Sequence, residues 1–270
     1  MTRLAWGIFI ALLAFSAAAQ TTAPSSPGDQ AVTVQAPPLR PLPPPPDASP
    51  TQLERTGDEL RSQKAYDDAI DYYTAALRKT PGSAVLHNKI GIAHLQMGRY
   101  DRAQKEFKRA IKVNTQYAEA HNNLGVVEYV KKKFKKAIKE YQKALALTPD
   151  SASFHSNLAT AYFARKEYDK ATVHYLRAMQ IDPEVFERQS HAGIAVRMSS
   201  PEDRARFAYT MAKLWAKVGD LDRGLRYLKK AVEEGYPSIG DVYKDQEFAA
   251  LRNDPRFAEI MARKEPLIPN

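Results

Sequence analysis

Three histidines recur at intervals of 34 residues, at His87, His121 and His155. Imidazole is a common metal ligand and a general acid or base near neutral pH, so a periodic histidine first suggests a metal or catalytic site. A fixed period places one histidine on each repeated element, about 8–10 Å from the next, whereas zinc holds nitrogen ligands at about 2.0–2.1 Å. His174 and His191 have no carboxylate or cysteine cluster near them in sequence. We therefore predict a packing role for these histidines and no metal site.

The histidines lie within a repeated pattern of small and aromatic residues. An alanine recurs every 34 residues, with an aromatic residue four positions later, a second alanine seven positions later and a small residue twelve positions earlier. The leading alanines are Ala69, Ala103, Ala137 and Ala171, the aromatics are Tyr73, Phe107, Tyr141 and Tyr175, the second alanines are Ala76, Ala110, Ala144 and Ala178, and the small residues are Gly57, Gly91, Gly125 and Ala159. A period of this length is typical of a solenoid, in which each unit buries its apolar face against its neighbours.

Each repeated position has a steric role in a pair of packed helices. Small residues let the two helices of a unit approach closely, and the aromatic residue lies on the same helical face as the leading alanine. Proline ends the second helix at Pro81, Pro149 and Pro183. We therefore predict four helix–turn–helix units, at 50–83, 84–117, 118–151 and 152–185.

The stretches AEAHNNLG at 118–125 and KAIKEYQKALALTP at 136–149 resemble the tetratricopeptide repeat (TPR) family. Two positions depart from the pattern: Thr115 replaces the closing proline of the second unit, and Ala159 replaces the glycine of the fourth. Both replacements are small or compatible with a turn. The resemblance implies an all-α, right-handed α-solenoid of about ten repeat helices plus a C-terminal capping segment. It also implies that a concave groove, lined by the first helix of each unit, binds a protein or an extended peptide.

Residues 1–19 have the pattern of a secretory signal peptide. Arg3 precedes an apolar run from Leu4 to Phe15, and small residues end the segment at Ala19. An uncleaved anchor is the alternative, but the run is short for a membrane span of about 20 residues. We expect cleavage after Ala19, export to the periplasm or the exterior, and no integral span in the mature chain. Because the sequence has no cysteine, it excludes disulfides and acylation on cysteine.

Residues 20–49 are rich in proline, serine, threonine and alanine. We predict a disordered, extended linker, because a run such as PLRPLPPPP at 38–46 can form neither helix nor core. Alternatively, RPLPPPP at 40–46 is a ligand for a domain that reads PxxP motifs. The order Ser49, Pro50, Gln52 predicts a capping box that starts the first helix.

The repeat lapses after residue 185 and returns in weaker form. Residues 186–204 are predicted to be an insert or an extra helix, and the sequence does not decide between them. A helix should start at Ser200 and Pro201 and end near Val218. We predict a degenerate fifth unit at 205–238, in which Gly224, Leu228 and Ala231 replace alanine, aromatic and alanine. Residues 239–270 form the expected C-terminal cap, since a stack of repeats leaves its last apolar face open.

One stripe of the first helices could bind the partner. We take the fourth, seventh, eighth and eleventh positions of each unit as packing positions, so the second, fifth, sixth, ninth and twelfth share the opposite face. Asparagine there could both donate to and accept from a peptide backbone, and apolar residues could receive side chains. The candidate partner-binding residues are Asn88, Lys89, Ile92, Asn122, Asn123, Val126, Tyr129, Ser156, Asn157, Thr160 and Phe163. The alternative is that these asparagines are merely exposed and typical of the repeat.

Two known ligand patterns of the resembling family fit this stripe only in part. The asparagine ladder of O-GlcNAc transferase repeats is matched at Asn123 and Asn157 but not at Arg55 or Lys89. The clamp that binds chaperone tails needs lysine and asparagine at the fifth and ninth positions of the first repeat. The first unit has Glu54 and Asp58 at these positions, so we do not expect this ligand.

The chain carries a formal net charge of +9, with the excess in units two and three. Most of these cations fall on the second helices, which should face outward. The basic patch comprises Lys105, Lys108, Arg109, Lys112, Lys132, Lys135, Lys136, Lys139 and Lys143. It could bind an anionic polymer, lipid surface or acidic protein, or it could be a solvated face in which Asp101, Glu106 and Glu140 form ion pairs. We expect no nucleic acid partner, because the predicted compartment holds none.

No motif for catalysis appears in the sequence. It has no glycine-rich phosphate loop, no HExxH and no GxSxG, and helical repeats occupy most of the chain after the linker. We therefore predict a non-enzymatic scaffold of the cell envelope without a cofactor. Binding of an anionic envelope component by the basic patch is the alternative function.

Overall fold

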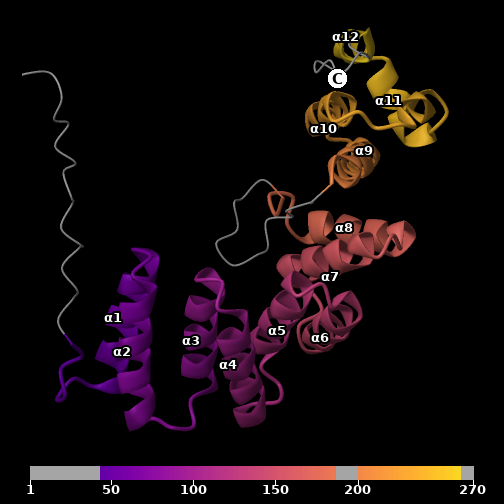
Figure 1. Ribbon diagram of the computed structural model, residues 1–270. Coiled ribbons are helices and arrows are strands. Elements are labelled where there is room, and N and C mark those ends of the chain that lie inside the picture. The colour runs from indigo at the N-terminus through magenta and orange to yellow at the C-terminus, as the bar shows by residue number, and fades with distance from the viewer. Residues whose placement is uncertain (1–42, 187–199, 263–270) are drawn as a thin grey trace, which may run out of the picture. The chain divides into compact units, whose positions relative to one another are not determined.

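The computed structural model describes residues 43–186 and 200–262 (Figure 1). Within these ranges the chain forms twelve α-helices and two short 3₁₀-helices, with no strand. The predicted signal peptide, the linker as far as residue 42 and the insert from 187 to 199 lie outside the described residues. No helix within the described ranges is both long enough and apolar enough to span a membrane.

Four helix pairs follow one another at the 34-residue period. In each pair the first helix has 13 residues and the second has 14. The pairs are α1 (Pro50–Ser62) with α2 (Tyr66–Lys79), α3 (Ala84–Gln96) with α4 (Tyr100–Val113), α5 (Ala118–Val130) with α6 (Phe134–Leu147), and α7 (Ala152–Ala164) with α8 (Tyr168–Ile181). Each helix packs against the next in the chain, as an α-solenoid requires.

The contact between glycine and aromatic residue explains how closely the helices of a pair approach. A Cβ atom on Gly57 would lie 2.5 Å from the ring of Tyr73, and one on Gly125 would lie 2.6 Å from the ring of Tyr141. Both rings are fully buried. The predicted steric role of the small residue is therefore confirmed in these units.

Serine side chains start three of the first helices. Ser49 forms the predicted capping box: its hydroxyl accepts from the Gln52 amide at 3.2 Å, and the Gln52 side chain accepts from the Ser49 amide at 2.8 Å. The hydroxyls of Ser83 and Ser151 cap α3 and α7 by accepting from the Leu86 and Phe154 amides, without the reciprocal bond. The chain just before α1 is also fixed, because the Lys79 ammonium donates to the carbonyls of Pro46 and Ala48 at 2.7 Å.

A fifth pair follows the inserted segment. Helix α9 (Pro201–Val218) starts at the predicted Ser200 cap and is longer than the other first helices, and α10 (Leu221–Glu233) buries Gly224, Leu228 and Ala231. Between the two helices Gly219 has a φ of +87°, a left-handed conformation that glycine adopts readily.

Short helices cover the apolar face of the fifth pair. They are η1 (Ile239–Tyr243), η2 (Gln246–Phe248), α11 (Ala249–Arg252) and α12 (Pro255–Ala262). Phe248, Leu251 and Phe257 pack with Ala212 and Leu228 of the fifth pair in one buried cluster. No further first helix follows α10 in the described part of the chain, so the array ends here with a different kind of packing.

Candidate partner-binding site

The predicted stripe on the first helices is not an open surface. Among the candidate residues, those that are buried are Asn88, Asn122, Asn123, Val126, Asn157, Thr160 and Phe163, and those that are half-buried are Lys89, Ile92, Tyr129 and Ser156. Val126 and Phe163, expected to receive partner side chains, belong instead to a hydrophobic core cluster. The expectation that these buried side chains are accessible is therefore wrong.

Stripe asparagines of neighbouring units form side-chain hydrogen bonds with each other. The side-chain amide of Asn123 donates to the oxygen of Asn88 at 2.9 Å, and that of Asn157 donates to the oxygen of Asn122 at 2.9 Å. The amide of Asn122 also donates to Asn123 at 3.3 Å. The sixth position of one unit thus bonds the fifth position of the unit before it, and the amide groups that were to bind a peptide are used within the array.

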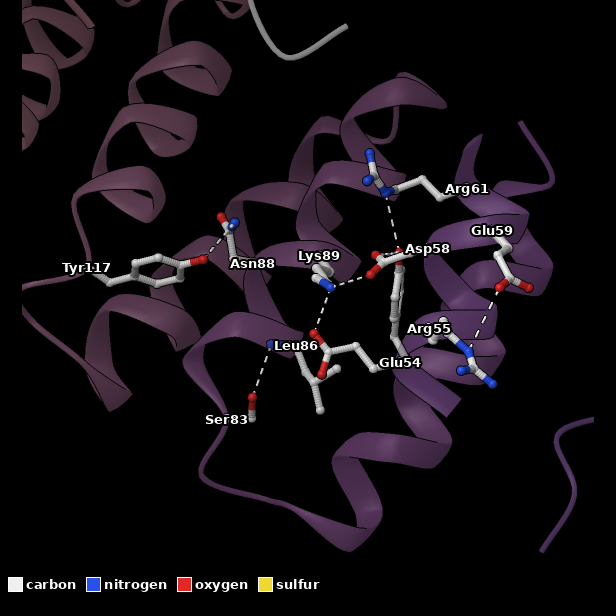
Figure 2. Close-up of polar contacts among 11 residues, drawn as sticks. Glu54, Arg55, Asp58, Glu59, Arg61, Ser83, Leu86, Asn88, Lys89 and Tyr117 are labelled. Atoms are coloured by element: carbon white, nitrogen blue, oxygen red, sulfur yellow. Dashed lines mark hydrogen bonds and ion pairs between the residues drawn. The ribbon is translucent and has the colours of Figure 1, made fainter. Parts of the chain in front are cut away.

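The first two units repeat this relationship with charged side chains (Figure 2). The Lys89 ammonium lies 2.6 Å from both Glu54 and Asp58. Burial alone would lower the pKa of Lys89, but its hydrogen bonds to Asp58 and Glu54 outweigh this effect and raise it. Glu54 and Asp58, because of which we do not expect a chaperone-tail ligand, thus form ion pairs with Lys89 of the same chain.

The periodic histidines each face a side chain of the second helix in their own unit. Nδ1 of His87 lies 2.8 Å from Glu106, and Nδ1 of His121 lies 2.8 Å from Glu140. These bonds hold the two helices of a unit together, consistent with a packing role. No group of three or more metal-ligating side chains occurs in the described ranges.

The fourth unit has a histidine in place of the glutamate. Nδ1 of His155 lies 3.0 Å from Nδ1 of His174, and Nε2 of His155 donates to the Pro149 carbonyl at 3.0 Å. With its proton on Nε2, neutral His155 must accept the proton of His174. Burial lowers the pKa of both rings, and for His174 the proximity of His155 lowers it further.

The basic patch is exposed at all nine positions. Arg109 pairs with Glu106, and Lys143 pairs with Glu140 at 2.8 Å. The other seven cations form no ion pair with any described residue. The interpretation as a solvated face is confirmed for all three of its acids, because Asp101 also forms an ion pair, at 2.6 Å with Lys131, which lies outside the patch.

A hollow that the stripe analysis missed lies at the fifth unit. Four of the same five positions of this unit, counted from residue 205, line a hollow of about 410 Å³: Arg206, Tyr209, Thr210 and Lys213. The twelfth position, Ala216, does not line it. Tyr168 of α8 and Tyr236 after α10 also line it. Extending the stripe into the degenerate unit would have found these residues. The hollow exists because no following first helix covers the stripe of α9 in the described part of the chain.

Arg206 is held between aromatic rings in this hollow. Its guanidinium carbon lies 4.9 Å from the centre of the Tyr168 ring and 5.6 Å from that of Tyr236. Tyr236 in turn stacks on Tyr209 at 4.4 Å. The one ion pair of Arg206 with a described residue is a 3.8 Å approach of its guanidinium to the exposed Glu202. A guanidinium stacked on aromatic faces keeps its donor edge for a planar acceptor such as a carboxylate.

The opposite side of the hollow is fixed by a second polar network. The Lys213 ammonium lies 3.0 Å from Asp245 and 3.5 Å from Glu247, and the Tyr209 hydroxyl donates to Asp245 at 2.9 Å. Burial would raise the pKa of Asp245, but the hydrogen bonds from Lys213 and Tyr209 outweigh it and lower the pKa. Burial and the bond to Asp245 together raise the pKa of Tyr209 far above its ordinary value. Both groups therefore keep fixed protonation states near neutral pH.

Comparison with known families agrees with the repeat pattern. Family models described as tetratricopeptide repeat match residues 88–152 and 152–185. Residues 88–185 of this chain are tetratricopeptide repeats. TPR units are helical scaffolds rather than enzymes. None of the curated proteins matches the chain.

The chain is similar to several solved structures. A crystal structure of MamA is 25% identical over 66% of this chain and 93% of its own, with a TM-score of 0.47. YrrB, described as a TPR protein with an unusual peptide-binding site, is 17% identical over 73% of this chain and 88% of its own, with a TM-score of 0.45. The first TPR of Spaghetti (RPAP3), bound to an HSP90 peptide, is 24% identical over 46% of this chain and 91% of its own, with a TM-score of 0.38.

Proposed function

We propose that this repeat protein is an interaction scaffold that binds a peptide segment of a protein partner in the hollow of its fifth unit. One observation carries the proposal: in units two to four the stripe asparagines bond each other, whereas in the fifth unit the half-buried Arg206, Thr210 and Lys213 line a hollow of about 410 Å³. A solenoid that binds through its first helices needs such an uncovered stripe.

The chemistry of the hollow suits an extended peptide with an acidic residue. The edge of the Arg206 guanidinium can take a carboxylate in two parallel hydrogen bonds. The faces of Tyr168 and Tyr236 offer rigid apolar contact with hydroxyl groups at their ends. Thr210 and Lys217 add polar groups for a peptide backbone.

Peptide selection from a displayed library, followed by fluorescence anisotropy, tests this function. We expect the selected peptides to contain an acidic residue and to lose at least about tenfold in affinity with Arg206→Glu, because one charge-assisted contact contributes about 1.5–3 kcal/mol. The matched control is Arg102→Glu, an exposed arginine on α4. Equal losses in both variants, or selection of no peptide, would refute the proposal.

We also propose that the scaffold works in the cell envelope. The apolar run from Leu4 to Phe15 followed by Ala17–Ala19 supports export, and the proline-rich linker would let the repeats reach a partner. Cell fractionation with N-terminal sequencing of the mature protein tests this. Export predicts a mature chain that begins at Gln20, and an intact Met1 in the cytoplasmic fraction would contradict it.

A further inference from the structure

The second helices of the repeat share an aspartate at their second residue, and one unit departs from this rule. Four units have Asp67, Asp101, Asp169 and Asp222 at this position. The third unit has Lys135. The departure reverses the charge at a position that the other units keep acidic.

Three of these aspartates pair with a cation from the element that follows them. Asp67 accepts from Arg99 at 2.5 Å and Asp101 from Lys131 at 2.6 Å, in each case from the turn of the next unit. Asp222 accepts from Arg256 of the cap at 2.8 Å. In these three units the repeat thus places a carboxylate opposite a cation of the following element.

At the third unit the same arrangement brings cations together. Lys135 and Arg165, which comes from the turn of the fourth unit, line one hollow of about 420 Å³ together with Lys132, Lys133 and Lys136. Glu167, the carboxylate of that turn, already pairs with Arg165 at 3.0 Å and with Lys170 at 2.8 Å. No described carboxylate pairs with any of the four lysines.

Like charges that line one hollow repel, and physiological salt screens this repulsion strongly only beyond the Debye length of about 8 Å. Single substitutions to lysine on an exposed helix are common, but this one removes the ion pair that the first, second and fifth units keep, and it adds a charge to an existing cluster. An anion bound in the hollow offsets this electrostatic repulsion among the cations. Three of these lysines belong to the basic patch, and the hollow assigns them a specific ligand site.

We propose that this hollow binds a phosphate group. Four lysines act as point charges without a preferred plane, which suits a tetrahedral oxyanion better than a flat carboxylate. A phosphate ester carries about −1.5 to −2 charges and three acceptor oxygens, enough to meet several ammonium groups at once. The site is separate from the hollow at Arg206 and does not depend on the peptide-binding function.

The test is titration of the full chain with inorganic pyrophosphate, followed by NMR, and with vesicles of anionic or neutral phospholipid, followed by sedimentation. The informative variant is Lys135→Asp, which restores the aspartate of the other units. We expect it to weaken phosphate binding at least about tenfold and to raise the Tm by about 1–3 °C, because an ion pair with Arg165 replaces repulsion. Lys230→Asp, an equal charge change at an exposed lysine of α10 outside both the hollow and the basic patch, should keep the binding.

The pyrophosphate and vesicle titrations distinguish a soluble phosphate from a lipid headgroup. Pyrophosphate binding that Lys135→Asp removes assigns a soluble phosphate, whereas binding to anionic vesicles alone with the same sensitivity assigns a lipid headgroup. Equal binding by the wild type and Lys135→Asp, or no binding to either probe, would overturn the proposal. Displacement by a polyglutamate peptide as effective as by pyrophosphate would also overturn it.

Discussion

The side-chain amide of Asn157 donates a hydrogen bond of 2.9 Å to the oxygen of Asn122, 35 residues earlier. Asn123 bonds Asn88 at the same separation and distance. The repeated separation means that each unit contacts the preceding one through the same pair of positions. The asparagines therefore join units to each other, and for this reason we propose the hollow at the fifth unit as the partner site.

Replacing Asn123 by leucine should destabilise the fold by about 1–3 kcal/mol, because it leaves polar groups of Asn88 and Asn122 without partners in a buried site. Urea unfolding measures this change. The double variant Asn88→Leu with Asn123→Leu should cost less than the sum of the single variants, since it removes both members of one bond. Additive costs, or a single variant as stable as the wild type, would contradict the assigned contact.

Gly125→Ala should cost about 1–3 kcal/mol, because the new Cβ would lie 2.6 Å from the buried ring of Tyr141 and force it to move. Gly82→Ala is the control, because no atom lies within 4 Å of a Cβ at that position. Thermal unfolding of both variants checks the expectation. A Gly125→Ala protein as stable as Gly82→Ala would show that the close approach is not required.

The His155–His174 pair should make the fold sensitive to mild acid. Both pKa values are lowered from the ordinary 6.5, so the folded state favours the neutral rings. The stabilisation is complete above about pH 6.5 and is lost as the pH falls below that value, because the unfolded chain takes up protons first. The Tm of the wild type should therefore fall between pH 7.5 and pH 5.5.

His174→Glu is the matched variant, because it copies Glu106 and Glu140 of the preceding units. The added carboxylate favours protonated His155, while Arg177 and Asp150, the charged groups beside His155, stay unchanged. The fall in Tm on acidification should shrink or change sign. An identical pH profile for the two proteins would rule out the pair as its source.

Asp245→Asn should weaken the wall of the peptide hollow. The pKa of Asp245 is lowered from 3.8, so its ion pair with Lys213 contributes stability above that pH and loses it as the pH falls below it. We expect the variant to be about 0.5–1.5 kcal/mol less stable than the wild type at pH 6, as for one lost hydrogen bond. Chemical unfolding at pH 6 and pH 3 tests this, because the difference should be smaller at pH 3 than at pH 6.

The repeat pattern predicted most of the fold because its main contacts lie within a unit. The clash between a Cβ on Gly91 and the ring of Phe107 depends only on the two helices of that unit, so a fixed spacing is enough to find it. The capping box at Ser49 is likewise local in sequence. Such contacts need no knowledge of how successive units are placed.

The site could not be predicted in the same way, because it depends on contacts between units. Whether Asn122 is open or buried is decided by the placement of the next first helix, which a 34-residue period does not specify. The hollow at Arg206 needs both the long α9 and the absence of a following first helix. Because the fifth unit departs from the repeat pattern, matching repeat positions along the sequence reveals neither feature.

Photo-crosslinking of a selected peptide tests the central claim most directly. A benzophenone amino acid is placed at Thr210, which lines the hollow, or at Ser156, a half-buried stripe position of the fourth unit. Binding in the fifth-unit hollow predicts efficient crosslinks from position 210 and few from position 156, and excess unlabelled peptide should remove them. Crosslinks mainly from position 156 would contradict the account, because they would show that the partner lies on the stripe that the asparagine bonds cover.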